Sequence, residues 1–265
     1  MILQLINEIN VYILILTVAL GFLGGFIDNA FGMGYGLLTP IFIIIGFSPL
    51  IVVPTLLLSQ AITGFSGTIF HQLYKNVEFK SINNQETKIV ILFVVIGITG
   101  SIFATIFAIT LNDLFMLLYI GNMMIIVGII VTFKIRFHFS WRKLYIISII
   151  AGFNKAISGG GYGSLVTSGQ LMSGIRARTS VGVTQFSECT ISAFGYLLYV
   201  ILIPLSEIIL TFQLSIIMAL AGLFAAPFGA LVVKKIEDDL ARKIVGLLSI
   251  ILGAISLIRL LFRVI

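Results

Sequence analysis

The chain has 265 residues, of which 59% are apolar and 10% are charged, and its formal net charge is +6. A soluble domain is nearer 45–50% apolar and about 25% charged, so the composition predicts an all-α integral membrane protein and leaves no length for a separate extramembrane domain. Excess Lys and Arg in a membrane protein usually mark cytoplasmic loops, so the positive charge does not indicate nucleic-acid binding.

Apolar runs divide the chain into two similar halves, given that a spanning helix needs about 20 apolar residues. The first half has a long region split by glycines, a near-span with isolated polar residues and two full spans, at residues 11–47, 50–74, 89–112 and 114–133. The second half repeats this order, at residues 144–174, 179–203, 208–233 and 243–262. We therefore predict two transmembrane repeats, residues 1–137 and 138–265, each a broken-helix or hairpin region plus three transmembrane helices.

The split regions carry related motifs, DNAFGMGYG at Asp28–Gly36 and KAISGGGYG at Lys155–Gly163. At an offset of 127 residues, six positions align: Gly25, Phe26, Gly32, Gly34, Tyr35 and Gly36 with Gly152, Phe153, Gly159, Gly161, Tyr162 and Gly163. The apolar piece after each motif has only 11 residues, which favours a broken helix or half-spanning hairpin; two tilted full helices that each cross the membrane are the alternative.

Basic residues fall in alternate connections of the chain. They are Lys75, Lys80, Lys88, Lys134, Arg136, Arg142, Lys143, Arg176, Arg178, Lys234, Lys235, Arg242 and Lys243, whereas the connections near 48–49, 111–113 and 204–207 carry no Lys or Arg. If every basic loop lies inside, the halves have opposite orientations, provided that each split region returns to its starting side. This pattern predicts inverted repeats, the architecture of many secondary transporters.

The paired motifs are the candidate binding site, because inverted-repeat transporters bind substrate near the midplane, where broken helices meet. We expect the short helices to begin just after each GYG, and a helix N-terminus offers free N–H groups and partial positive charge to an anion. The predicted contacts are Asn29, Gly34, Tyr35, Gly36, Gly161, Tyr162 and Gly163. The alternative is a pair of tight glycine turns that serve only helix packing.

Polar side chains open the long helices that follow. Ser59 and Gln60 in LLSQAITG and Gln185 in VTQFSECT are predicted to bind an oxyanion through neutral donors, or else to bond neighbouring helices. His71, near a helix end, is interpreted as an interfacial histidine.

Three ionisable residues lie inside the predicted spans, where a charge is costly and faces a cavity or a partner. Asp28 and Lys155 hold equivalent motif positions and are predicted to form an ion pair across the two-fold axis; alternatively Lys155 binds the anion and Asp28 carries a proton. Glu188 is predicted either to carry a proton or to pair with Lys155.

Four stretches together resemble the TauE/SafE family of sulfite and organosulfonate exporters: GGFIDNAFGMGYGLLTP, AGFNKAISGGGYGSLVTSG, HQLYKNVEFK and GLFAAPFGALVVKKIEDDLARKIVGLLSIILGA. The resemblance covers essentially the whole chain. It implies a multi-pass transporter of a small sulfur-containing anion in a prokaryotic plasma membrane, and export rather than uptake. The first motif departs from the family at Phe31-Gly32-Met33-Gly34, where many relatives have an unbroken glycine run.

The sequence therefore predicts a secondary transporter of sulfite, a sulfonate or a related oxyanion that works by alternating access, with an anion channel as the alternative. No enzymatic activity and no cofactor or metal are expected, since Cys189 is the single cysteine, no Walker motif is present and only Asp28 among the aspartates lies deep in a span. The expected partners are the anionic substrate, the lipid bilayer and, as an open alternative, further copies of the chain in a homo-oligomer.

Overall fold

The computed structural model describes residues 11–108, 113–133 and 138–264. Regular structure in these ranges is helical, and the elements are α2 (Val11–Phe31), η1 (Gly34–Leu37), α3 (Leu38–Ile45), α4 (Pro49–Leu73), α5 (Gln85–Ala108), α6 (Asp113–Thr132), α7 (Trp141–Ser158), α8 (Tyr162–Met172), α9 (Ala177–Leu202), α10 (Leu205–Lys235) and α11 (Asp238–Val264). Of the described helices, α2, α4, α5, α9 and α10 are long and apolar enough to cross a membrane. This confirms the predicted all-α membrane class.

The C-terminal ends of several helices recur in the second half at the same offset of 127 residues that relates the two motifs. α2, α3 and α5 end at Phe31, Ile45 and Ala108, and α7, α8 and α10 end 127 residues later in each case, at Ser158, Met172 and Lys235. The boundary proposed near residue 137 lies in the segment 134–137, which is outside the described residues together with Lys134 and Arg136. It stays a prediction.

The first helix of each half ends in the same way. Gly32 and Gly159 both adopt a φ of 72°, in the left-handed region that residues with a β-carbon rarely enter. The Gly32 N–H donates to the carbonyl of Asp28 at 2.7 Å, and the Gly159 N–H donates to the carbonyl of Lys155 at 2.8 Å. A glycine that closes a helix in this conformation is a common C-terminal cap, and here it turns the chain back into η1 and α8.

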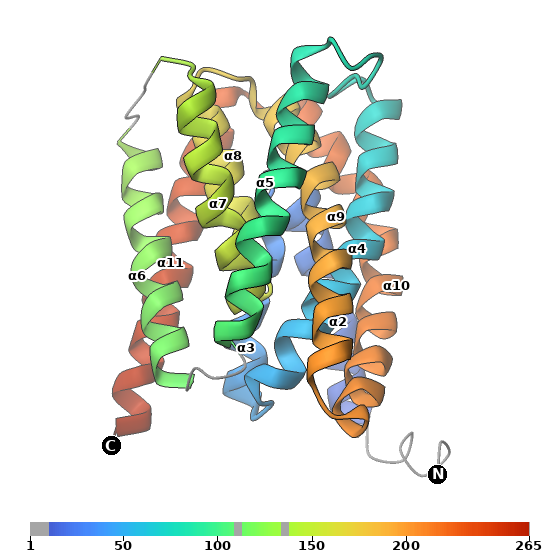
Figure 1. The fold of residues 1–265 in the computed structure, drawn as a ribbon, viewed down its shortest axis with the longest axis vertical. Helices are drawn as coiled ribbons and strands as arrows, with labels where there is room; N and C mark the ends of the chain where they lie inside the picture. Colours follow the sequence, from blue (N-terminus) through green and yellow to red (C-terminus); the bar gives the residue numbers. More distant parts are fainter. Residues whose placement is uncertain (1–10, 109–112, 134–137, 265) are drawn as a thin grey trace.

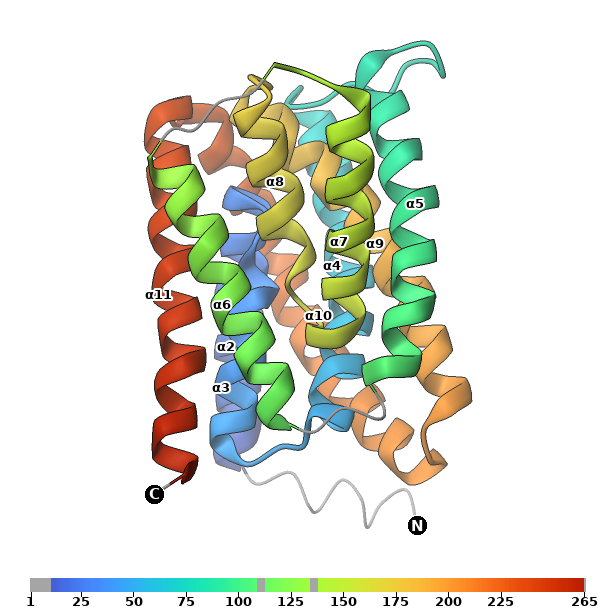
Figure 2. The same cartoon turned by 60° about the vertical axis from the view of Figure 1, so that its left-hand side comes forward.

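Each split region is a hairpin that returns to its starting side. In Figures 1 and 2, α2 starts at the bottom of the bundle and α3 ends there, whereas α7 starts at the top and α8 ends there. The helices that follow run in opposite directions in the two halves: α4 runs upward and α9 downward. This is the arrangement that an inverted repeat requires.

The described basic loops gather at one end of the bundle. The loop after α4, the start of α7, the turn before α9 and the turn after α10 all lie at the top in Figure 1. They carry Lys75, Lys80, Arg142, Lys143, Arg176, Arg178, Lys234 and Lys235. The positive-inside rule predicts that this end faces the cytoplasm, and we call it the basic end.

The two halves interleave rather than stand apart. The most extensive helix contacts pair α2 with α10, α6 with α11, α5 with α7, and α4 with α10 and α9, each time one helix from each half. Glycines bring several of these pairs into backbone contact. A β-carbon on Gly25 would lie 2.7 Å from Cα of Gly222, and one on Gly128 would lie 2.7 Å from the carbonyl oxygen of Gly246. Small residues at such crossings let membrane helices approach closely.

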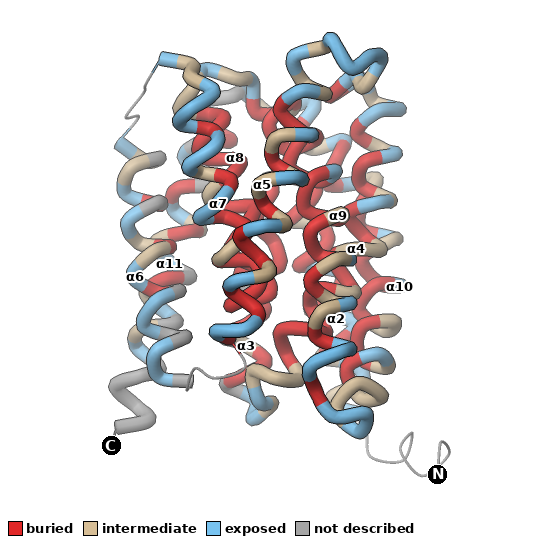
Figure 3. The backbone as a smooth tube through the Cα atoms, in the orientation of Figure 1, coloured by how far each residue is buried: buried red, intermediate tan, exposed pale blue. Residues whose placement is uncertain are grey.

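Burial follows the interleaving, as Figure 3 shows, with buried backbone along the middle of the bundle and exposed positions along its outside. Large apolar side chains such as Phe103, Phe224 and Leu23 are exposed, which suits helices whose outer faces contact lipid. The buried interior also contains charged side chains, among them Asp28, Lys155 and Glu188.

The close crossing of α2 and α10 yields a prediction about stability. Gly25→Leu should lower the free energy of unfolding by at least about 2 kcal/mol, because the added side chain would overlap the backbone of Gly222. The measurement is denaturation of the purified protein by titrating SDS into mild detergent. Leu23→Phe, which enlarges an exposed side chain on the same helix, is the control; equal stability of the two variants would contradict the packing described here.

Candidate functional site

The two glycine motifs touch each other backbone to backbone. A β-carbon on Gly160 would overlap the backbone of Tyr35 and Gly36, and one on Gly163 would overlap the carbonyl oxygen of Gly32. Side chains at these positions would therefore push the motifs apart. The glycines are explained by this contact, which brings the starts of η1 and α8 together in the interior.

Asp28, in the last turns of α2, is fully hydrogen-bonded. Its Oδ1 accepts the N–H of Gly34 at 2.9 Å, and its Oδ2 accepts the side-chain amides of Gln60 and Gln185, both at 2.7 Å. These donors come from η1, α4 and α9. One buried carboxylate thus ties together three elements of both halves, and charge-assisted hydrogen bonds of this kind are the strong ones.

The two glutamines differ in what they have left to offer a ligand. A side-chain amide has two N–H donors. Gln185 uses both on Asp28, one on Oδ2 and one on the backbone carbonyl at 2.8 Å. Gln60 donates to Asp28 once and so retains a second N–H. Both N–H donors of Gln185 are therefore occupied in this structure, whereas Gln60 has one left and remains a candidate ligand.

Lys155 pairs with Glu188 and not with Asp28. Its Nζ lies 2.7 Å from Glu188 Oε1, and the two side chains are 0% and 1% exposed. The predicted Asp28–Lys155 pair is therefore wrong, and the alternative partner, Glu188, is correct. The physical reason is that Asp28 already accepts three donors, so the nearby carboxylate of α9, which has no such donors, supplies the negative charge that a buried ammonium needs.

The second oxygen of Glu188 lies at the start of α8. Glu188 Oε2 is buried without a hydrogen-bond partner, and a β-carbon on Gly163 would lie 2.9 Å from it. Tyr162 and Gly163 are the first residues of α8, where a helix leaves N–H groups without intrahelical acceptors and carries partial positive charge. The carboxylate thus sits between an ammonium and a helix N-terminus, which is an environment built for an anion.

Tyr35 completes the wall beside Lys155. Its hydroxyl lies 2.9 Å from Ser59 Oγ and 2.8 Å from Thr63 Oγ1, and Lys155 Nζ lies 5.9 Å from the centre of its ring. Ammonium groups at this distance are attracted to an aromatic face. The sequence did not point to Thr63, although it follows Ser59 by four residues and therefore shares its helix face.

Some predicted contacts are engaged in other ways. The N–H of Gly34 is bonded to Asp28, and the N–H of Gly161 is bonded to Ser158 Oγ at 2.8 Å, so these two amides are not free for an anion as expected. η1 begins at Gly34 and α8 at Tyr162, slightly earlier than predicted. In both motifs a side chain from the preceding helix accepts an N–H of the turn, Asp28 in the first and Ser158 in the second. This role of Ser158 was not predicted from the sequence.

Asn29 and Tyr162 lie at the edges of this cluster. The side-chain amide of Asn29 donates to the carbonyl of Gly25 at 2.8 Å, and the backbone carbonyl of Asn29 lies 3.1 Å from His71 Nε2. His71 is fully buried and packs inward, between α2 and the loop after α4; its position at the membrane interface stays a prediction. The ring of Tyr162 belongs to an apolar cluster with Phe93 and Ile191.

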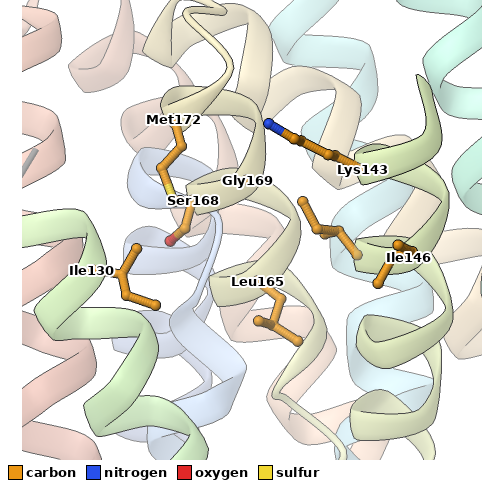
Figure 4. A pocket seen from close by; sticks show the side chains of 8 residues that line it. Ile130, Lys143, Ile146, Leu165, Ser168, Gly169 and Met172 are labelled. Carbon is orange, nitrogen blue, oxygen red and sulfur yellow. The ribbon is translucent and has the colours of Figure 1, made fainter. Parts of the chain in front are cut away.

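The cavity in Figure 4 is separate from this cluster. It has a volume of about 300 Å³ and lies between α6, α7 and α8, where Ile130, Ile146, Ile147, Leu165 and Met172 make its walls mostly apolar and Lys143, Ser168 and Gly169 complete the lining. None of the predicted site residues lines it. Within the described ranges, no three His, Cys, Asp or Glu side chains come together as a metal site.

A bundle of spanning helices around a buried cluster of charges and broken helices is the construction of a membrane transporter. A family model described as sulfite exporter TauE/SafE matches residues 17–255, and the chain belongs to this family. The chain is also 25% identical over 259 residues to a protein described as probable membrane transporter protein YtnM from Bacillus subtilis (strain 168), covering 92% of this chain and 83% of the relative. No solved structure matches the chain significantly.

The three-donor carboxylate gives a second stability prediction. Asp28→Asn should lower the free energy of unfolding by about 2–3 kcal/mol, because one oxygen is replaced by an N–H₂ group that faces donors. The thermal unfolding midpoint in detergent should fall accordingly. Glu237→Gln removes a carboxylate from an exposed turn and should leave the midpoint unchanged; matching midpoints for both variants would show that the Asp28 bonds carry no stability.

Proposed function

We propose that this protein is a secondary transporter that exports a small sulfur-containing anion, such as sulfite, a sulfonate or a related oxyanion, by alternating access. The observation that carries the proposal is the place of the Glu188 carboxylate, held by Lys155 at 2.7 Å and lying against the start of α8. A carboxylate and a small oxyanion have similar charge and similar acceptor oxygens. The substrate would therefore replace the carboxylate at Lys155.

This replacement of the Glu188 carboxylate by the substrate anion keeps the Lys155 ammonium neutralised at every stage. A buried ammonium without a negative partner is costly in a membrane. When the site is empty of substrate, Glu188 supplies that partner; when an anion arrives, the anion supplies it, and Glu188 must leave, either by rotating away or by accepting a proton. One buried lysine favours a singly charged substrate over a doubly charged one.

Asp28 has a supporting role in this scheme. It is a negative charge near the proposed site and would repel an anion if it were bare, but three donors stabilise its charge. It holds Gln60 in reach of the site and fixes the turn between α2 and η1. The Tyr35 ring forms the wall beside Lys155, and the contacts of its hydroxyl with Ser59 and Thr63 hold that ring in place.

Alternating access requires groups of helices that move against each other. Because the sequence halves interleave, the moving groups cannot be the two halves as contiguous blocks. α6 and α11 contact each other far more than they contact the remaining helices, so this pair is the proposed unit that moves relative to the rest. Export of an anion would be favoured by an inside-negative potential, which is worth about 2.3 kcal/mol per charge at 100 mV.

The names of the family and of the relative support this proposal. The burial of Asp28, Lys155, Glu188, Gln60 and Gln185 favours a carrier with an occluded site over an anion channel with a continuous wet path. Current measurements in a planar bilayer separate the two, because a carrier gives no single-channel openings.

Removing the buried pair tests the site. The double variant Lys155→Met/Glu188→Gln removes both charges, so it avoids leaving one of them buried and alone, and should stay folded. Sulfite flux into proteoliposomes should fall by at least about a hundredfold, because loss of a charged ligand interaction in a desolvated site costs about 2–5 kcal/mol. Lys88→Gln, on an exposed turn of α5, is the charge control. Normal flux in the folded double variant would overturn the site.

Removing only the Glu188 carboxylate tests whether it competes with the substrate anion for Lys155. Glu188→Gln leaves Lys155 without its carboxylate partner, so equilibrium binding of sulfite should tighten by about tenfold or more, which corresponds to about 1.4 kcal/mol. Net transport should slow, because the substrate-free protein would have to reorient with a bare buried ammonium, whereas sulfite–sulfite exchange should persist. Calorimetric titration and paired net-flux and exchange assays measure both effects. Weaker binding in this variant would show that Glu188 assists the anion and does not compete with it.

A further inference from the structure

A second charged hollow lies at the basic end, away from the buried pair. It has a volume of about 630 Å³ and is lined by the end of α4 and the loop after it, the start of α5, the start of α9 and the end of α10. The lining residues are Tyr74, Lys75, Asn76, Val77, Glu78, Asn84, Glu86, Arg176, Arg178 and Lys234. We call this hollow the vestibule.

Positive charge dominates the vestibule. Lys75, Arg176, Arg178 and Lys234 face two carboxylates, Glu78 and Glu86, and both carboxylates are engaged within their own loop. Glu78 pairs with Lys80 at 2.6 Å, which also holds the pKa of Glu78 below its usual range, and Glu86 accepts the N–H of Glu78 at 2.7 Å. Four cations against two engaged carboxylates leave a net positive field, and a concave surface focuses such a field on anions.

Lys75 stands in the vestibule at a conformational cost. Its φ of 57° makes it the one described non-glycine residue with a positive φ, at a position just past the end of α4 where glycine is the usual choice. A glycine would fit this backbone better, so nothing in the local fold calls for lysine. What lysine adds is a charge in the lining of the vestibule.

The floor of the vestibule leads to the buried cluster through a short polar column. Asn76 lines the vestibule, and its side-chain amide lies 3.1 Å from His71 Nδ1 and donates to the carbonyl of Ala230 at 2.8 Å. His71 Nε2 lies 3.1 Å from the carbonyl of Asn29, the residue after Asp28. Asn76, His71 and Asn29 are all buried, and Asn76 Oδ1 and Asn29 Oδ1 have no hydrogen-bond partner.

Orphaned acceptors of this kind are costly in an apolar interior, and two of them lie in this column, which forms a path of polar side chains through a tightly packed part of the bundle. α9 links the two ends of that path, since it carries Arg178 in its first turn and Gln185 beside Asp28.

We propose that the vestibule is a second, shallow anion site that collects the substrate at the basic end, and that the Asn76–His71–Asn29 column is its closed floor above the buried site. The inference rests on the proposed transport of a small oxyanion and adds the route by which that anion reaches Lys155. The chemistry that the vestibule recognises is a hydrated oxyanion such as sulfite or sulfate. It binds by long-range charge and not by a desolvated pocket, so its effect is sensitive to salt.

Neighbouring lysines on α10 provide a matched transport test. Lys234 lines the vestibule and Lys235 does not, and Lys→Gln at either position removes the same charge from the same end. Lys75→Gly is the second vestibule variant and relieves the backbone at a positive φ, so loss of fold does not complicate it. Sulfite flux is compared in everted membrane vesicles, which expose the cytoplasmic face, and in right-side-out vesicles.

Lys234→Gln and Lys75→Gly should raise KM for sulfite at least about threefold in everted vesicles at low ionic strength, and less than this at high salt. The maximal rate, and KM in right-side-out vesicles, should stay as in the wild type. Lys235→Gln should behave as the wild type on both faces. Equal effects of Lys234→Gln and Lys235→Gln, or equal KM shifts on the two faces, would overturn the vestibule while leaving the transport proposal intact.

A binding measurement keeps the inference testable if the wild type moves no sulfite. Sulfate is titrated against the purified protein at constant ionic strength, with chloride as the balancing ion, and the thermal midpoint is followed. Ligand binding raises that midpoint by mass action, so the sulfate-dependent rise should be smaller in Lys234→Gln than in Lys235→Gln. Identical rises would contradict the vestibule site; absent flux in wild-type vesicles would instead contradict the transport proposal.

Discussion

A lysine buried inside a membrane protein needs a negative partner, and this requirement organises the centre of the molecule. Lys155, on α7, is fully buried and meets that need through Glu188 on α9, two helices further along the chain. Because Asp28 is already bonded by Gly34, Gln60 and Gln185, the two carboxylates have separate tasks. Asp28 holds the turn after α2 and the two glutamines in place, and Glu188 neutralises the Lys155 ammonium, which a substrate anion could neutralise equally well.

This arrangement exists only because the two glycine motifs touch. Gly160 and Gly163 bring the turn after α7 against the turn after α2, closer than any side chain would allow. The same contact places the start of α8 beside the Glu188 carboxylate. The tight glycine turns and the binding site were offered as alternative interpretations of the motifs. The structure shows the turns, and the binding site that we propose depends on them.

The sequence predicted the helical membrane fold, the order of elements and the residues that meet at the centre, because apolar length, glycine repetition and intramembrane charge are local signals. It left the partner of Lys155 open between Asp28 and Glu188. Asp28 and Lys155 are equivalent in the repeat, but equivalence under a two-fold axis does not fix which partner each finds. That choice depends on the donors around Asp28, and two of them, Gln60 and Gln185, come from helices that are distant in sequence. The burial of His71 was not predicted for a similar reason: it depends on the loop after α4, which folds back so that Asn76 contacts the imidazole.

The most direct test of this account is a structure of the protein with a bound anion, obtained with selenite, whose selenium can be located by its anomalous scattering. The account predicts a selenium peak within hydrogen-bonding reach of Lys155 Nζ at the start of α8, with the Glu188 carboxylate moved away from the lysine. A bound anion elsewhere, with the 2.7 Å contact between Lys155 and Glu188 intact, would contradict it.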